Sequence, residues 1–218
     1  MTRYQAVLFD AFGTLFELDD PFGRLGRGVR ERLGLERDPS DVEAAFLAEA
    51  SYFAAHCHEA VDAATLQELN EHCAGIVVER LDLPVSAQDA LDALGDSIAY
   101  RLFDDVTPAL ADLDRRGVRT AVVSNWDYSL VDVLAGLGLA FEVVVTSAGT
   151  GASKPDPAPF RAALDALGIA PGQALHVGDT PEADGDGARE AGIEVRIIDR
   201  DGGRPGTIAR LTEVAALL

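Results

Sequence analysis

The sequence has little basic charge. Its 18 lysine and arginine residues face 37 aspartate and glutamate residues, which leaves a formal net charge of −19. So acidic a chain has no basic surface to follow a nucleic-acid backbone, and an anionic membrane surface repels it. A small anionic ligand can still bind where a few cations gather around it. We therefore expect a small anionic substrate as partner, and neither nucleic acid nor membrane.

Cysteine is scarce too, and its two occurrences, Cys57 and Cys73, give no disulfide framework. No apolar run approaches the length of a membrane span. The apolar stretch near the N-terminus is too short for a signal peptide, because Asp10 interrupts it. These absences predict a cytoplasmic protein with reduced thiols. No pattern indicates an oligomeric state.

Lysine is the rarest cation, since the chain has 17 arginines but a single lysine, Lys154. Any chemistry that requires an amine side chain must therefore use this residue. Lys154 is followed by Pro-Asp-Pro, a sequence typical of a turn that leads into a helix.

Short apolar runs alternate with helix-like segments that end at a glycine, from about residue 106 onwards. This alternation predicts an α/β fold whose parallel sheet is covered by helices on both faces. The predicted strands are 118–123, 141–145, 174–177 and 195–198, with a further strand at 6–9.

Residues 20–104 differ, because they show helical periodicity and no strand-like run. Asp20 begins the first predicted helix, Ser40 and Thr65 each start a capping-box pattern, and Ser86 can cap a fourth helix. This segment therefore predicts about four helices.

The contrast predicts two domains. Residues 1–19 and 105–218 would form the α/β core, and residues 20–104 would form a helical insertion directly after the first strand. In an open parallel sheet, ligands bind beyond the carboxyl ends of the strands. Polar residues that follow the predicted strands are therefore the candidate site.

Four strand ends carry such residues. Carboxylates recur among them, and close carboxylates repel one another unless a cation is present. The first strand is followed by Asp10-Ala11-Phe12-Gly13-Thr14-Leu15, the second by Ser124 and Asn125, the third at some distance by Lys154, and the fourth by Gly178, Asp179 and Asp184.

These four motifs, in this order and with the helical insertion after the first, resemble those of the haloacid dehalogenase-like hydrolases. The resemblance implies a Rossmann-like core and a mobile α-helical cap formed by residues 20–104. It implies that Asp10 is a nucleophile that forms a covalent intermediate with the substrate.

The resemblance also implies roles for the other strand-end residues. Ser124 and Asn125 would hydrogen-bond a transferring oxyanion, and Lys154 would neutralise charge on the nucleophile and the substrate. Thr14 would support the nucleophile by hydrogen bonding. Mg²⁺ would be held by the carboxylates of Asp10, Asp179 and Asp184 and by the backbone carbonyl of Phe12.

Phe12 stands where phosphatases of this family carry a second aspartate, which protonates the leaving group and then activates water. General acid–base catalysis contributes about 10²–10⁴-fold, or about 2.7–5.4 kcal/mol, and a phenyl ring supplies none of it. The leading hypothesis is a Mg²⁺-dependent phosphohydrolase that acts on a small phosphorylated metabolite through an aspartyl-phosphate at Asp10. It would favour good leaving groups or borrow a proton carrier such as Glu17, Asp19 or Asp20.

Two alternatives stay open. A 2-haloacid dehalogenase, which forms an ester at Asp10, also reads D-A-[FY]-G-T-L, because halide leaves without protonation. Against it, such enzymes carry Ser and Asn where this chain has Gly178-Asp179-Thr180, an Arg in the stretch equivalent to 46–52, and a Tyr where this chain has Phe160. The other alternative is a binding or regulatory protein of this fold with weak turnover.

A few further residues attract attention but predict no site. His176 lies inside a predicted strand and is interpreted as a packed core histidine, and Trp126 either lines the pocket or packs in the core. A cluster on two predicted helices hints at metal, but adjacent helical positions point in different directions, which disfavours tetrahedral zinc. Its members are His56, Cys57, His58, His72 and Cys73.

Overall fold

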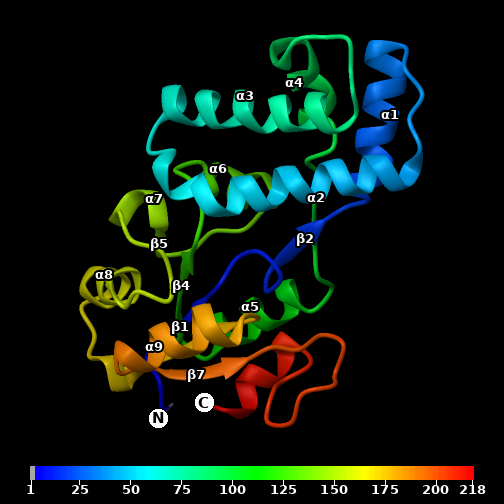
Figure 1. Ribbon diagram of the computed structural model, residues 1–218. Coiled ribbons are helices and arrows are strands. Elements are labelled where there is room, and N and C mark those ends of the chain that lie inside the picture. The colour runs from blue at the N-terminus through cyan, green and yellow to red at the C-terminus, as the bar shows by residue number, and fades with distance from the viewer. Residues whose placement is uncertain (1–2) are drawn as a thin grey trace. The chain divides into compact units, whose positions relative to one another are not determined.

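The computed structural model describes residues 3–218 and divides into two compact units (Figure 1). One unit consists of the residues up to Glu17 together with Leu102–Leu218, and the other is Leu18–Arg101. The predicted boundaries, between 19 and 20 and between 104 and 105, lie within a few residues of these. That the second unit acts as a mobile cap stays a prediction.

The first unit is built on a five-stranded sheet with the order β5-β4-β1-β6-β7. All four neighbouring pairs are parallel, and Phe9 lies between Val122 and Val177 in the register. The strands match the predicted apolar runs and confirm the α/β, Rossmann-like fold class. They are β1 (Ala6–Phe9), β4 (Arg119–Ser124), β5 (Val143–Thr146), β6 (Ala174–Gly178) and β7 (Glu194–Ile197).

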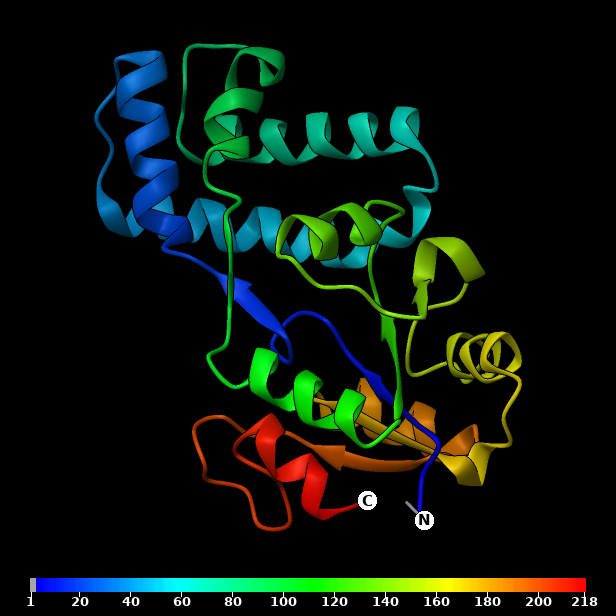
Figure 2. The same ribbon diagram turned by 180° about the vertical axis from the view of Figure 1, so that it is seen from behind.

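Helices cover both faces of this sheet. Figures 1 and 2 show α5 (Val106–Arg115) on one face and α8 (Ala158–Leu167) with α9 (Gly187–Glu190) on the other. Successive side chains of a strand point to opposite faces, and Ala6 and Leu8 belong to the apolar cluster that contains α8 and α9 residues. The remaining helical segments of the unit include α6 (Leu130–Gly136), α7 (Ser147–Thr150), η2 (Pro171–Gln173), η3 (Pro181–Asp186) and η4 (Leu211–Ala216).

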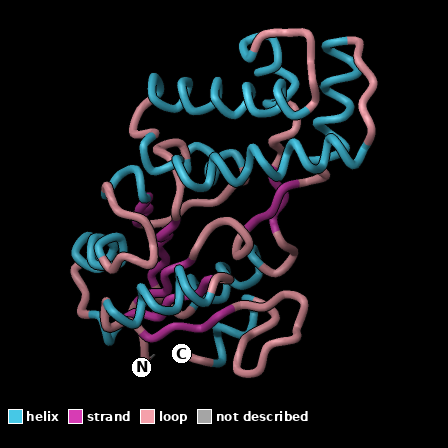
Figure 3. The backbone as a smooth tube through the Cα atoms, viewed as in Figure 1, coloured by secondary structure: helices cyan, strands magenta, loops and turns pink. Residues whose placement is uncertain are grey.

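The second unit is helical, as Figure 3 shows. It has its own apolar core, which includes Phe46, Leu69 and Val77. Nowhere in residues 3–218 is a helix both long and apolar enough to cross a membrane. The helices of this unit are α1 (Pro21–Leu33), α2 (Pro39–His56), η1 (Cys57–Glu59), α3 (Ala63–Arg80) and α4 (Ala87–Gly95).

Two of these helices begin earlier than their sequence patterns suggested. The N-cap of α2 is Asp38, which accepts a hydrogen bond from the Ser40 backbone and precedes a proline suited to the first helical position. The N-cap of α3 is Asp62, which forms a capping box with Thr65. In both cases an upstream aspartate takes the cap, whereas Ser86 caps α4 as predicted.

Two short strands, β2 (Phe16–Leu18) and β3 (Tyr100–Leu102), pair with each other. The boundary between the two units falls within both strands. The chain therefore leaves the first unit and returns to it through one two-stranded ribbon.

Candidate active site

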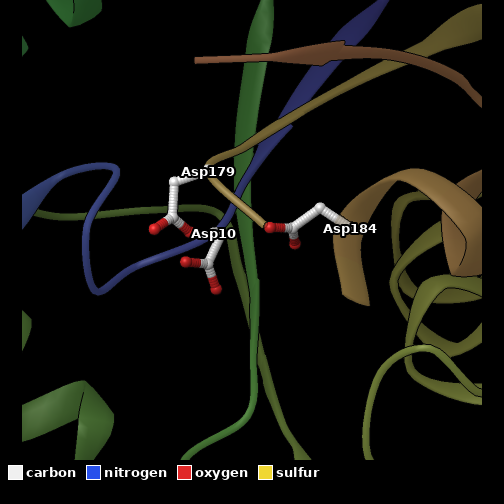
Figure 4. A group of neighbouring side chains, drawn as sticks. All are labelled: Asp10, Asp179 and Asp184. Carbon is white, nitrogen blue, oxygen red and sulfur yellow. The ribbon is translucent and has the colours of Figure 1, made fainter. Parts of the chain in front are cut away.

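Three carboxylates meet at the carboxyl end of the sheet. Asp10 follows β1, Asp179 follows β6, and Asp184 lies on η3, a π-helix (Figure 4). One carboxylate oxygen from each lies within 4.8 Å of the others. Because β1 and β6 are adjacent and parallel, the residues that follow them emerge side by side. The sequence-predicted trio is therefore assembled in space.

Two glycines allow this close approach. Gly13 has a φ of +77°, and a Cβ built on it would lie 2.3 Å from Oδ2 of Asp179. A Cβ on Gly178 would lie 2.1 Å from Cγ of Asp184. Any larger residue would displace a carboxylate, so both glycines shape the acidic site.

Lys154 lies among these carboxylates. Its Nζ donates hydrogen bonds to Oδ1 of Asp10 and to Oδ1 of Asp184, each at 2.6 Å. The side chain is 3% exposed, against 8% for Asp10 and 1% for Asp184. The peptide bond between Lys154 and Pro155 is cis. The single lysine thus forms a buried cation between two carboxylates.

Asn125 holds Lys154 through its backbone. Its Oδ1 accepts from the Lys154 N–H at 2.7 Å, and its Nδ2 donates to the Lys154 carbonyl at 3.0 Å. A side-chain amide has two N–H donors, so one remains for a substrate oxygen. The predicted oxyanion contact stays a prediction, and positioning of Lys154 is a role that sequence reasoning missed.

The two hydroxyls expected around the nucleophile behave differently. Ser124 Oγ donates to Oδ1 of Asp10 at 2.9 Å. Thr14 Oγ1 is buried and has no hydrogen-bond partner among residues 3–218, so the predicted bond from Thr14 to Asp10 is not formed. Thr14 is held instead through its main-chain carbonyl, which accepts from Arg200.

Burial and neighbouring charges shift the pKa values of these groups. Burial and the carboxylates of Asp10 and Asp184 raise the pKa of Asp179 to about 6. Burial also raises the pKa of Asp10, against the effect of Lys154. For Asp184, burial acts upwards, but Lys154 and His176 outweigh it and hold the pKa well below its usual range. For Lys154, burial acts downwards, but the two carboxylates raise its pKa above the usual value.

The carboxylate set suits a divalent cation. Three acidic groups lie together and one lysine pairs with two of them, so negative charge is in excess. Oxygen ligands are those that hard cations such as Mg²⁺ prefer. Because Gly13 and Gly178 have no Cβ, Asp179 and Asp184 can lie close enough to share such a cation. Asp10, Asp179 and Asp184 are therefore the residues that could hold a divalent metal.

His176 also contacts this site, which sequence reasoning did not anticipate. The residue is fully buried on β6, as expected of a core histidine, but its Nε2 lies 2.9 Å from Oδ1 of Asp184. The sequence indicates the strand face of His176 but not its partner. His176 lies two positions before Gly178, so both occupy the same face of β6, and Gly178 is where Asp184 packs.

A second missed residue, Arg200, braces the loop after Asp10. Its guanidinium donates to the carbonyls of Gly13 and Thr14 and to both oxygens of buried Asp105, at 3.0 and 3.1 Å. It also lies over the ring of Phe103, 3.6 Å from the centroid. Arg200 therefore joins the loop after Asp10 to the segment that follows β3.

Phe12 is 42% exposed, and its ring is one of three aromatic rings in mutual contact. Its centroid lies 6.2 Å from that of Phe16 and 6.3 Å from that of Trp126. Phe16 is fully buried and Trp126 nearly so. Beside the nucleophile loop the chain therefore presents an apolar ring in place of an ionisable group.

The histidine and cysteine cluster of the second unit forms a packed group. The ring of Tyr52 stacks on that of His56 at 4.2 Å and on that of His72 at 6.1 Å, and the side chains of Cys57 and Cys73 are buried. Across residues 3–218, the residues able to gather ligand atoms around a metal are the three aspartates of the first unit.

Comparison with known proteins agrees with this geometry. A profile of the haloacid dehalogenase-like hydrolases matches residues 4–192. Human haloacid dehalogenase-like hydrolase domain-containing protein 3 is 30% identical over 210 residues, which cover 90% of this chain and 82% of that protein. The phosphoserine phosphatase of Thermus thermophilus is 43% identical over 104 residues, but these are only 46% of this chain and 42% of the phosphatase.

Solved structures share the fold. The magnesium-bound HAD-hydrolase YfnB of Bacillus subtilis has a TM-score of 0.76 at 18% identity, with 100% of this chain and 99% of that chain covered. Structures of 2-haloacid dehalogenases share it too, so the fold by itself does not separate phosphatase from dehalogenase. The chain belongs to the haloacid dehalogenase-like hydrolases and is a hydrolase of that family.

Proposed function

We propose that this hydrolase is a Mg²⁺-dependent phosphohydrolase that cleaves a small phosphorylated compound through an aspartyl-phosphate at Asp10. The observation that carries the proposal is the acidic group itself: Asp10, Asp179 and Asp184 lie together, and one ammonium, that of Lys154, pairs with two of them. A nucleophile alone would not need two further carboxylates, whereas a divalent cation would.

The nucleophile is placed for attack by its neighbours. In the first step an oxygen of Asp10 bonds to phosphorus while the bond from phosphorus to the leaving-group oxygen breaks. Ser124 and Lys154 both donate to the same oxygen of Asp10, Oδ1, so Oδ2 is the one left to attack. In the second step water attacks phosphorus and the bond from phosphorus to the Asp10 oxygen breaks. Both protons of the water leave with the phosphate, and the Asp10 carboxylate is restored.

Charge on the transferring phosphoryl group needs compensation. Lys154 is a buried cation beside Asp10 and would stabilise this charge where water is largely excluded. Mg²⁺, held by the carboxylates of Asp10, Asp179 and Asp184 and the carbonyl of Phe12, would supply further positive charge when bound. Asn125 fixes the backbone of Lys154 and retains one N–H for a phosphoryl oxygen.

The leaving group defines the substrate class. Phe12 offers no proton, so the activation barrier stays higher by the roughly 2.7–5.4 kcal/mol that general acid–base catalysis would remove. Leaving groups that depart as stable anions, such as those of aryl or acyl phosphates, do not require that proton. The half-exposed Phe12 ring therefore favours such compounds over simple alkyl phosphates.

Phe12 also supports a second candidate function, dehalogenation of a 2-haloacid, because halide needs no proton to leave. In that reaction Asp10 would displace halide from carbon and form an ester. The acidic pair Asp179 and Asp184 opposes this alternative, since displacement of halide has no use for a metal site.

A paired assay tests the proposal. Phosphate release from an aryl phosphate is measured with Mg²⁺ and with chelator, and halide release from 2-chloropropionate is measured under both conditions. We expect Mg²⁺-dependent phosphate release that Asp10→Asn abolishes, while Asp165→Asn, at an exposed carboxylate on α8, is active. Halide release insensitive to chelator would establish the dehalogenase instead. Metal binding without turnover on either compound would indicate a binding protein.

A further inference from the structure

His176 is fully buried at the centre of β6 and has a polar partner for each ring nitrogen. Nδ1 lies 3.0 Å from the carbonyl oxygen of Leu8, and Nε2 lies 2.9 Å from Oδ1 of Asp184. Both partner oxygens are hydrogen-bond acceptors, so each ring nitrogen is placed to donate a hydrogen bond. The reaction steps proposed above give this histidine no part.

The contacts of Asp184 show what the histidine does. Oδ1 of Asp184 accepts a hydrogen bond from Nζ of Lys154 at 2.6 Å and lies 2.9 Å from Nε2 of His176. Oδ2 accepts a hydrogen bond from the Thr180 backbone N–H at 3.0 Å. A carboxylate has about four lone-pair positions, two on each oxygen. Oδ1 is therefore fully used, and one position on Oδ2 is left for a metal.

The histidine is itself held in place. Leu8 and His176 are register partners in the adjacent strands β1 and β6, so the contact with the Leu8 carbonyl is made across the sheet. The ring of Phe160 packs edge-on against the imidazole at 4.9 Å between centroids. These contacts fix the imidazole relative to the sheet. Through its contact with the imidazole, the carboxylate of Asp184 on the π-helix η3 is also held in place relative to the sheet.

We propose that His176 is a positioning residue for the metal site. By occupying Oδ1 of Asp184 together with Lys154, it fixes the rotation of the carboxylate so that Oδ2 faces the cation. This inference rests on the proposed metal-dependent function. Partners that orient a metal ligand typically contribute about 10–100-fold to metal affinity.

The test measures Mg²⁺ binding by titration calorimetry in the absence of substrate, together with kcat and KM for an aryl phosphate. His176→Phe keeps the ring shape and removes both nitrogens, so the Kd for Mg²⁺ should rise about 10–100-fold, while KM at saturating Mg²⁺ changes little. His176→Gln restores an N–H donor toward Asp184 and should recover most of that affinity. Leu167→Val, which alters packing in the apolar cluster that contains α8 and removes no hydrogen bond, should bind Mg²⁺ like the native protein.

Thermal melts of each variant confirm that the protein tested is folded. An unchanged Kd in His176→Phe would overturn the inference, and so would equal losses in His176→Gln and His176→Phe. If His176→Phe does not fold, the comparison of His176→Gln with His176→Leu decides in the same way. Native protein that binds Mg²⁺ but hydrolyses no phosphate ester would refute the proposed function. The Kd values of the His176 variants for Mg²⁺ would then still decide whether His176 positions Asp184. Native protein that binds no Mg²⁺ would refute both.

Discussion

The ammonium nitrogen of Lys154 lies 2.6 Å from Oδ1 of Asp10, and both side chains are almost completely shielded from solvent. Breaking a buried pair by removing one partner leaves an uncompensated charge in the interior. Because Lys154 also pairs with Asp184, a single substitution here exposes two carboxylates to that penalty. We therefore expect substitution of Lys154 to lower the stability of the folded protein as well as to change the chemistry of the site.

Lys154→Met should lower the free energy of unfolding of the metal-free protein by about 3–5 kcal/mol, as expected when a buried ion pair loses one member. Urea denaturation in the presence of chelator measures this. Arg161→Met removes an exposed cation from α8 and provides the matched control, with a change under about 0.5 kcal/mol. Equal stability of the two variants would contradict the account of Lys154.

Asp179 makes the stability of the metal-free protein depend on pH. Its pKa is raised from 3.8 to about 6, so the folded state binds more protons than the unfolded state between these values, and stability falls as the pH rises through this window. Asp179→Asn should therefore stabilise the metal-free protein at pH above about 6, by about 1–2 kcal/mol once partial exposure is allowed for.

Melting temperatures with chelator across this pH range test the effect. The advantage of Asp179→Asn should shrink as the pH is lowered from about 6 towards 3.8, where the native carboxyl is neutral in the folded state. Asp165→Asn should show no such dependence. A constant difference across the range would mean that repulsion and burial do not act on Asp179 as described.

Phe12→Asp tests the missing proton transfer. The variant should hydrolyse an alkyl phosphate up to about 10²–10⁴-fold faster than the native protein. The reason is that the alcohol of an alkyl phosphate is a poor leaving group and needs a proton to depart. The first step with an aryl phosphate, measured as the initial release of the phenol, should change much less. Phe12→Asn is the control, since it is similar in size and polarity but transfers no proton at this step, and equal rates in the two variants would exclude acid–base catalysis from position 12.

Arg200 should prove necessary for the order of the nucleophile loop. Arg200→Met leaves the buried carboxylate of Asp105 without its cation and frees the carbonyls of Gly13 and Thr14. We expect a loss of about 3–5 kcal/mol in stability and faster amide hydrogen exchange across residues 12–16. Arg204→Met, at an exposed position, is the control, and unchanged exchange in Arg200→Met would show that the loop is ordered by other contacts.

The parts of the molecule that could be predicted are those governed by local pattern. Apolar runs define strands, and parallel strands bring their carboxyl ends together, so Asp10, Asp179 and Lys154 could be grouped without coordinates. The contact of His176 with Asp184 and that of Arg200 with Asp105 were not predictable. They depend on how distant segments pack, and Arg200 lies 95 residues from its partner.

Main-chain contacts account for the other differences. Nothing in the sequence indicates that the Asn125 amide binds the Lys154 backbone. Nor does it indicate that Thr14 is held by its carbonyl while its hydroxyl has no hydrogen-bond partner in the described part of the chain. Two helices, α2 and α3, begin at N-cap residues other than those predicted from the sequence. Several side chains near the start of a helix compete for the same backbone N–H groups.

The central claim is that Asp10 carries the phosphoryl group during turnover. The most direct measurement is peptide mass spectrometry of protein quenched in acid during hydrolysis of an aryl phosphate with Mg²⁺. We predict a phosphoryl group on the peptide that contains Asp10, absent from Asp10→Asn and from protein incubated with chelator. Phosphate release with an unmodified Asp10 peptide, or a phosphoryl group found on another residue, would contradict it.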